Sequence, residues 1–165
     1  MRDFSPVYSL PNVPAVYALY SGKRRASYVA YVGIAGHLKQ RIIQHLIRRD
    51  SSVATGTSAV NLNPDFVSKI CWWENSDFWK ADHLKAAEMV AFEVLNPALR
   101  SRGAVDNAGM SLFEDETFKN KYVEFFEGEP TDTIEFPSLT DAMEKIKTIE
   151  AKLLELEKII QELKE

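Results

Sequence analysis

Two tyrosines, an arginine, a histidine and a glutamate in the first hundred residues could act together in one reaction. Arg41 and His45 stand four residues apart, so a helix would present both on one face. A guanidinium stabilises negative charge that develops on a phosphate, and a carboxylate such as Glu88 is a good ligand for a hard cation. Tyr17 or Tyr31 would act as a base only where nearby cations lower its pKa from the ordinary value of about 10. Together these groups suit hydrolysis of a phosphodiester bond, although each taken singly also fits an ordinary strand aromatic or helix surface.

Other reaction chemistries have no support in the sequence. The single cysteine excludes an internal disulfide, and the three histidines lack the close spacing of a zinc site. Neither a P-loop nor a G-x-G-x-x-G segment is present, so we expect no nucleotide cofactor. The N-terminus has no signal-peptide pattern, and no stretch is apolar over the roughly 18 residues that a membrane span needs. We therefore expect a cytoplasmic protein with no membrane partner.

Short strands and helices must position the candidate residues. Segments 15–20, 28–33 and 66–73 are rich in β-branched and aromatic residues, which predicts three strands. Apolar residues recur at helical spacing from Leu38, which predicts a helix that carries Arg41 and His45. These elements predict an α+β fold with a small three-stranded antiparallel sheet flanked by helices.

The rest of the first 136 residues is less regular. Residues 50–65 read as a long polar loop. Asp82 is expected to cap a helix that contains Glu88 and ends before Pro97. The stretch 101–136 is rich in aromatic residues and is expected to form a helix that packs on the core.

The C-terminal segment has a heptad pattern. Apolar residues occupy both core positions through four heptads: Leu139, Ile146, Leu153 and Ile160 at a, and Ala142, Ile149, Leu156 and Leu163 at d. Ser138 and Asp141 resemble a capping box at the start. We expect 138–165 to form a coiled-coil helix that pairs two copies of the chain, with an amphipathic helix folded onto its own domain as the alternative.

Two short segments and a later helix resemble the GIY-YIG nuclease family. The segments AVY (15–17) and YVG (31–33) look like the paired tyrosine motifs of that family. Arg41 follows Gly33 by eight residues, and Pro97 follows Glu88 by nine, as in the family pattern. The resemblance covers about residues 14–100. Two departures are Ala15 in place of the usual glycine and Arg100 in place of a common asparagine.

The resemblance implies metal-dependent cleavage of DNA. Glu88 would hold one Mg²⁺ or Mn²⁺, and Arg41 would lie against the scissile phosphate. Tyr17 and Tyr31 would line the site, and one of them would position or deprotonate the attacking water. His45 matches a histidine that some members carry one helical turn after the arginine.

The distribution of charge agrees with a nucleic-acid partner. Residues 1–105 have a net charge of +5 and residues 106–165 a net charge of −9. Cations that could contact DNA phosphates are Lys23, Arg24, Arg25, Lys39, Arg48, Arg49 and Arg100. Nothing in the sequence points to base-specific recognition.

Three regions follow from these patterns. We expect a nuclease-like domain over 1–105, an acidic helical extension or linker over 106–137, and the coiled-coil helix over 138–165. Two alternatives for function stay open. One is a nucleic-acid-binding module that does not cleave, and the other is an adaptor that works through its coiled coil.

Overall fold

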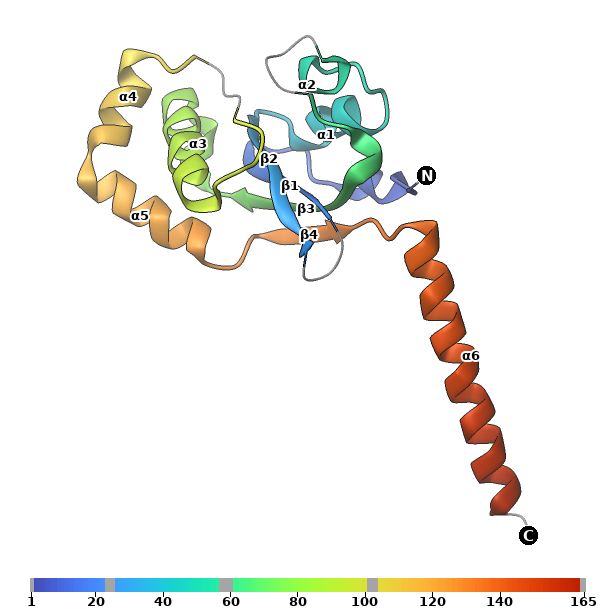
Figure 1. Cartoon of the computed structure of the whole chain (residues 1–165). Helices are drawn as coiled ribbons and strands as arrows, with labels where there is room; N and C mark the ends of the chain where they lie inside the picture. The colour runs from blue at the N-terminus through green and yellow to red at the C-terminus, as the bar shows by residue number, and fades with distance from the viewer. Residues whose placement is uncertain (1, 23–25, 57–60, 101–103, 164–165) are drawn as a thin grey trace. The chain divides into compact units, whose positions relative to one another are not determined.

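A computed structural model of the chain shows an α+β fold (Figure 1). It describes residues 2–22, 26–56, 61–100 and 104–163. The chain divides into a compact unit, Phe4–Phe136, and a second unit that contains the C-terminal segment Pro137–Glu165. All the candidate catalytic residues belong to the first unit.

The sheet has four antiparallel strands in the order β2-β1-β3-β4. Their bounds are Ala15–Ser21 for β1, Tyr28–Ala35 for β2, Val67–Glu74 for β3 and Asp132–Glu135 for β4. The expectation of three strands is therefore wrong, because the sheet has a fourth strand, β4, at its edge. In β4, Ile134 lies opposite Ile70 of β3. β4 has four residues with an acidic residue at each end, so its sequence carries almost no alternating pattern.

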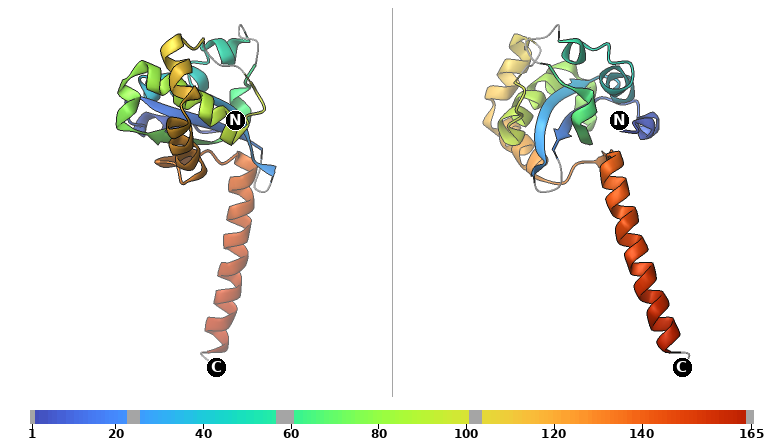
Figure 2. Two further views of the ribbon diagram at one scale, coloured as in Figure 1. Left: turned by 90° about the vertical axis from the view of Figure 1, so that its left-hand side faces the viewer. Right: turned by 45° about the vertical axis from the view of Figure 1, so that its right-hand side comes forward.

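Each side of the sheet is buried under helices (Figures 1 and 2). Side chains alternate along β1, so Tyr17 and Leu19 face one core while Val16 and Ala18 face the other. The first core lies under η1 (Ser5–Ser9) and α1 (Leu38–Leu46). The second lies under α3 (Ala81–Leu95) and α5 (Glu116–Glu127). Burial on both faces explains why β1 reads as an almost continuous apolar run.

Two segments contain more regular structure than their sequences suggested. The polar stretch 50–65 holds α2 (Ser52–Thr55) and the start of η3 (Pro64–Phe66). The stretch 101–136 holds two helices rather than one, α4 (Asn107–Glu114) and α5. The break falls at Asp115, whose side chain accepts from Phe118 N and caps α5.

The helix that carries Glu88 begins earlier than expected. α3 starts at Ala81 with Lys80 at the N-cap position, so Asp82 is not the cap. Asp82 lies in the first turn, where Oδ1 accepts from the backbone N–H of His83. A carboxylate in this turn still complements the helix dipole.

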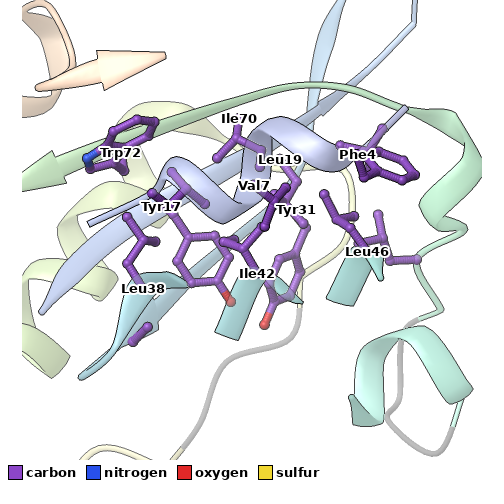
Figure 3. Packing of buried hydrophobic residues seen from close by; sticks show 14 of the residues in the cluster. Phe4, Val7, Tyr17, Leu19, Tyr31, Leu38, Ile42, Leu46, Ile70 and Trp72 are labelled. Atoms are coloured by element: carbon purple, nitrogen blue, oxygen red, sulfur yellow. The ribbon is translucent and has the colours of Figure 1, made fainter. Parts of the chain in front are cut away.

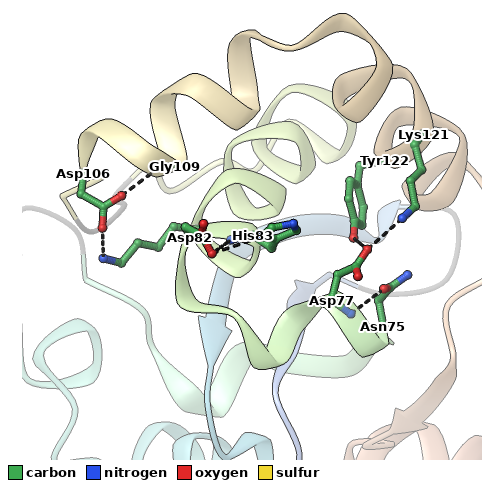
Figure 4. Close-up of polar contacts among 9 residues, drawn as sticks. Asn75, Asp77, Asp82, His83, Asp106, Gly109, Lys121 and Tyr122 are labelled. Atoms are coloured by element: carbon green, nitrogen blue, oxygen red, sulfur yellow. Dashed lines mark hydrogen bonds and ion pairs between the residues drawn. The ribbon is translucent and has the colours of Figure 1, made fainter.

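Ion pairs and hydrogen bonds fasten α4 and α5 to the rest of the first unit (Figure 4). Lys85 on α3 pairs with Asp106 at the start of α4, at 3.0 Å. Asp77, in η4 (Ser76–Trp79), accepts from Lys121 Nζ at 2.9 Å and from the Tyr122 hydroxyl at 3.3 Å. The stretch expected to be an extension or linker therefore lies within the same compact unit as the sheet.

The C-terminal unit contains one long helix, α6 (Leu139–Glu162). The capping box at Ser138 and Asp141 is present, as predicted. The apolar side chains at positions a and d are exposed except for Ala142, which is half-buried. Met143, Leu154 and Ile159, at other heptad positions, are exposed as well. Whether α6 forms a coiled coil stays a prediction. Among the described residues, no helix is long and apolar enough to cross a membrane.

Candidate active site

Tyr17 and His45 form the centre of a buried polar cluster. Tyr17 Oη lies 2.7 Å from Nε2 of His45, and both side chains are fully buried. The Tyr31 ring packs edge-on to the His45 ring, with centroids 5.7 Å apart, and lies 6.2 Å from the Tyr17 ring. Figure 3 shows the hydroxyl groups of Tyr17 and Tyr31 pointing to the same side. Strands β1 and β2 and helix α1 thus bring three predicted site residues into contact.

Gly33 makes this packing possible. It lies directly opposite Tyr17 in the register of β1 and β2. A Cβ at position 33 would lie 2.6 Å from Tyr17 Oη and 2.9 Å from Tyr31 Cε1. β2 continues to Ala35, so Gly33 does not end the strand as its sequence suggested. Its role is to leave space for two aromatic rings.

Arg41 and Glu88 complete the cluster. Arg41 is half-buried on α1, where its Nη1 donates to Gln44 Oε1 at 3.1 Å. Glu88 is only 4 % exposed on α3, although α3 covers the opposite face of the sheet. The charges of both residues act on the phenol groups of Tyr17 and Tyr31. The structure therefore brings together all five residues that the sequence nominated as catalytic.

The surroundings keep both tyrosines protonated. Burial raises the pKa of Tyr17 well above its ordinary value, and the charge of Glu88, like that of an ionised Tyr31, raises it further. Burial and then the charge of Glu88 raise the pKa of Tyr31. Arg41 lowers the pKa of each phenol, but burial outweighs it. Arg41 alone therefore does not convert either tyrosine into a base at neutral pH.

His45 is a neutral imidazole in this environment. Burial, together with the nearby charge of Arg41, lowers the pKa of His45 to about 3. The ring has a partner on each side, because Nδ1 lies 2.8 Å from Ser51 Oγ. Sequence reasoning missed Ser51, which it placed in a polar loop. A serine before a short helix signals an N-cap, but that pattern gives no sign of a contact with His45.

The two glutamates of α3 occupy different environments. Glu93 is exposed and pairs with Lys119 at 2.8 Å. Glu88 is buried beside the tyrosines, where a carboxylate is uncommon unless it has a partner or a function. Glu88 is therefore the stronger candidate for a site carboxylate.

The donors fit a magnesium ion that keeps most of its water. Within the described part of the chain, no group of three or more His, Cys, Asp or Glu side chains could hold a metal ion. Mg²⁺ dehydrates reluctantly and is held in many sites by one or two carboxylates. Glu88 could supply one such oxygen ligand, since its charge acts on the phenol groups of both tyrosines.

The predicted DNA-binding cations have varied surroundings. Lys23, Arg24 and Arg25 lie outside the described residues. Arg48 pairs with Asp50 at 2.5 Å and Arg49 with Asp65 at 2.7 Å, so nearby carboxylates offset both charges.

The other two predicted cations, Lys39 and Arg100, lie on α1 and after α3. Lys39 is half-buried on α1. Arg100 is exposed and donates to Asn96 Oδ1, and both residues line a hollow of about 470 Å³ along α3. The hydrogen bond of Arg100 is therefore with a neutral amide and not with a carboxylate, and it does not offset the positive charge of Arg100.

Comparisons of the chain with protein families, curated proteins and solved structures found no match. The case for a function therefore depends on the geometry of the chain's own residues and on the motif resemblance described above.

Proposed function

We propose that this protein is a metal-dependent endonuclease of the GIY-YIG type that hydrolyses phosphodiester bonds in DNA. The observation that carries the proposal is the convergence of Tyr17, Tyr31, Arg41, His45 and Glu88 from four elements into one buried cluster. Burying charged groups such as Glu88 costs stability even where they have partners, so an apolar core has no need of this set. Such clusters are more typical of reaction sites.

Each residue has a role that its environment supports. Arg41 is half-buried, so its guanidinium can contact a phosphate and stabilise the charge that develops on it. Tyr17 and Tyr31 are neutral phenols that orient the attacking water or the phosphate by hydrogen bonding. His45 holds the Tyr17 hydroxyl in place. Glu88 would hold Mg²⁺ or Mn²⁺, and the cation would supply Lewis-acid stabilisation of the phosphate.

A nicking assay on supercoiled plasmid DNA tests the proposal. We expect cleavage with Mg²⁺ or Mn²⁺, and a loss of at least about 100-fold in Glu88→Gln. Glu93→Gln is the matched control, since it removes a carboxylate from the same helix and should keep activity near that of the wild type. Equal cleavage by wild type and Glu88→Gln would mean a contaminating nuclease and would overturn the assignment.

Each of the two alternative functions would be favoured by a different experimental result. Binding of DNA without cleavage by the wild type, under conditions where the protein is folded, would favour a nucleic-acid-binding module. A chain without 138–165 that binds DNA normally but loses a protein partner would favour an adaptor. We further propose that α6 pairs two copies, because one site cuts one strand and two sites together could cut both.

A further inference from the structure

A chain of three buried side chains connects the start of α2 to the candidate site. Ser51 Oγ lies 2.8 Å from Nδ1 of His45, and Nε2 of the same ring lies 2.7 Å from Tyr17 Oη. Ser51 is 4 % exposed, and the other two side chains are fully buried. Solvent therefore does not compete for these hydrogen bonds, and their directions depend on the protons that the three groups carry.

The hydrogen-bonding capacity of Ser51 decides which group donates in the hydrogen bond between Ser51 and His45. A serine hydroxyl has one proton and two lone pairs. The backbone N–H of Ala54 donates to one lone pair at 3.2 Å, as part of the cap of α2. If Nδ1 of His45 also donated, both lone pairs would be used. The hydroxyl proton would then lack an acceptor among the hydrogen bonds of the described residues, which is rare for a buried donor.

The protonation state of the imidazole decides which group donates in the hydrogen bond between His45 and Tyr17. His45 is neutral, so its ring carries one proton. If Nδ1 accepts from Ser51, that proton is on Nε2, which then donates to Tyr17 Oη. We propose that Ser51 fixes His45 in the tautomer protonated at Nε2 and so makes His45 a hydrogen-bond donor to Tyr17.

This arrangement has a consequence for the reaction, and that consequence rests on the proposed function. Tyr17 accepts from His45, so its own hydroxyl proton points away from the imidazole. Tyr31 is the acceptor for that proton, because a side-chain hydrogen bond from Tyr17 acts on the Tyr31 phenol, and Tyr31 would in turn donate to a phosphate oxygen or orient the attacking water. The opposite tautomer would engage the Tyr17 proton with His45 and remove this donation to Tyr31. Ser51 acts through His45 and is a positioning residue.

The tautomer can be observed directly in the ¹⁵N-labelled full chain. Two-bond ¹H–¹⁵N correlation spectra distinguish a protonated ring nitrogen from an unprotonated one, and the spectrum of His45→Gln assigns the His45 signals. We expect Nε2 protonated and Nδ1 unprotonated in the wild type. The opposite pattern in the wild type would overturn the inference, whatever any variant does.

Variants of α2 separate the role of Ser51 from simple capping. Ser51→Ala should show a new population protonated at Nδ1, while Ser51→Thr, which keeps a hydroxyl, should keep the wild-type pattern. Thr55→Val is the control, because it removes a 3.0 Å hydrogen bond to the Ser51 carbonyl and leaves Ser51 Oγ in place. A folded Ser51→Ala chain with the wild-type pattern would contradict the inference.

Kinetics give a readout that is separate from the spectra. In the nicking assay we expect Ser51→Ala to lower kcat about tenfold with little change in KM, and Ser51→Thr to restore it. If the wild type proves inactive, the proposed function fails but the tautomer is still decided by the spectra. If Glu88-dependent cleavage is found with His45 protonated at Nδ1, only the role of Ser51 fails.

Discussion

Gly33 lies against the Tyr17 ring so closely that no side chain fits at position 33. The two residues are direct partners across β1 and β2, and a Cβ on Gly33 would come within 2.6 Å of Tyr17 Oη and 2.8 Å of Cζ. Gly33 is not among the glycines with positive φ. The glycine is therefore required by the close approach of a phenol ring and not by backbone conformation.

Replacing Gly33 with alanine should disturb both stability and the site. We expect Gly33→Ala to lower the free energy of unfolding by about 1–3 kcal/mol, because the new methyl group must displace Tyr17 or Tyr31. Urea denaturation measures the loss. Gly36→Ala is the matched control, since a Cβ there meets nothing within 4 Å. Equal stability of the two variants would show that the rings move aside at no cost.

Much of the fold follows from local patterns in the sequence. A high content of β-branched and aromatic residues predicted β1, β2 and β3, and helical spacing predicted α1 and the helix that carries Glu88, because each of these elements buries at least one continuous apolar face. The edge strand β4 has no such face, since it has only four residues and is stabilised by pairing with β3. Edge strands of this kind depend on tertiary structure, so local sequence does not reveal them.

The candidate site was predictable only in part. Motif spacing nominated Tyr17, Tyr31, Arg41, His45 and Glu88, and the structure gathers them. The contact between Ser51 and His45 depends on how the chain folds back after α1, which no periodicity encodes. The raised pKa of Tyr17 could not be predicted from the sequence either, because it comes from burial against residues distant in sequence.

The buried state of His45 should make stability depend on pH. The folded pKa of about 3 lies below the ordinary 6.5, so the unfolded chain binds the extra proton as pH falls. This contribution to stability is fully present above pH 6.5 and is lost as pH decreases towards 3. Between pH 8 and pH 5, we expect the wild type to lose about 2 kcal/mol more than His45→Gln.

Urea denaturation of both chains at both pH values checks this expectation. The comparison between chains matters, because His45→Gln also loses hydrogen bonds and is less stable at every pH. When the loss of stability in His45→Gln is subtracted from the loss in the wild type, the contributions of titratable groups that both chains share cancel. Equal losses in the two chains would show that His45 is already protonated, or not buried, in the folded state.

Two arginines should contribute unequally to DNA binding. Arg49 is paired with Asp65, whereas Arg100 contacts the neutral amide of Asn96. A cation that neutralises a phosphate adds about one to the slope of log K against log salt concentration. We expect Arg100→Gln to reduce that slope by about one and Arg49→Gln to reduce it less, as measured by fluorescence anisotropy with a labelled duplex. A larger effect at Arg49 would mean that DNA displaces Asp65, contrary to this prediction.

The apolar side chains of α6 should hold two chains together. Ile146 and Ile149 occupy positions a and d and are 54 % and 57 % exposed in the single chain. Burial of such side chains drives coiled-coil pairing, and a buried carboxylate opposes it. We expect sedimentation velocity at micromolar concentration to show a dimer that Ile149→Asp converts to a monomer. Ala151→Glu, at the outward position f, should leave the dimer intact because that position does not face the partner helix. A monomeric wild type at the same concentration would exclude pairing through α6, and cleavage of the two DNA strands would then require separate binding events.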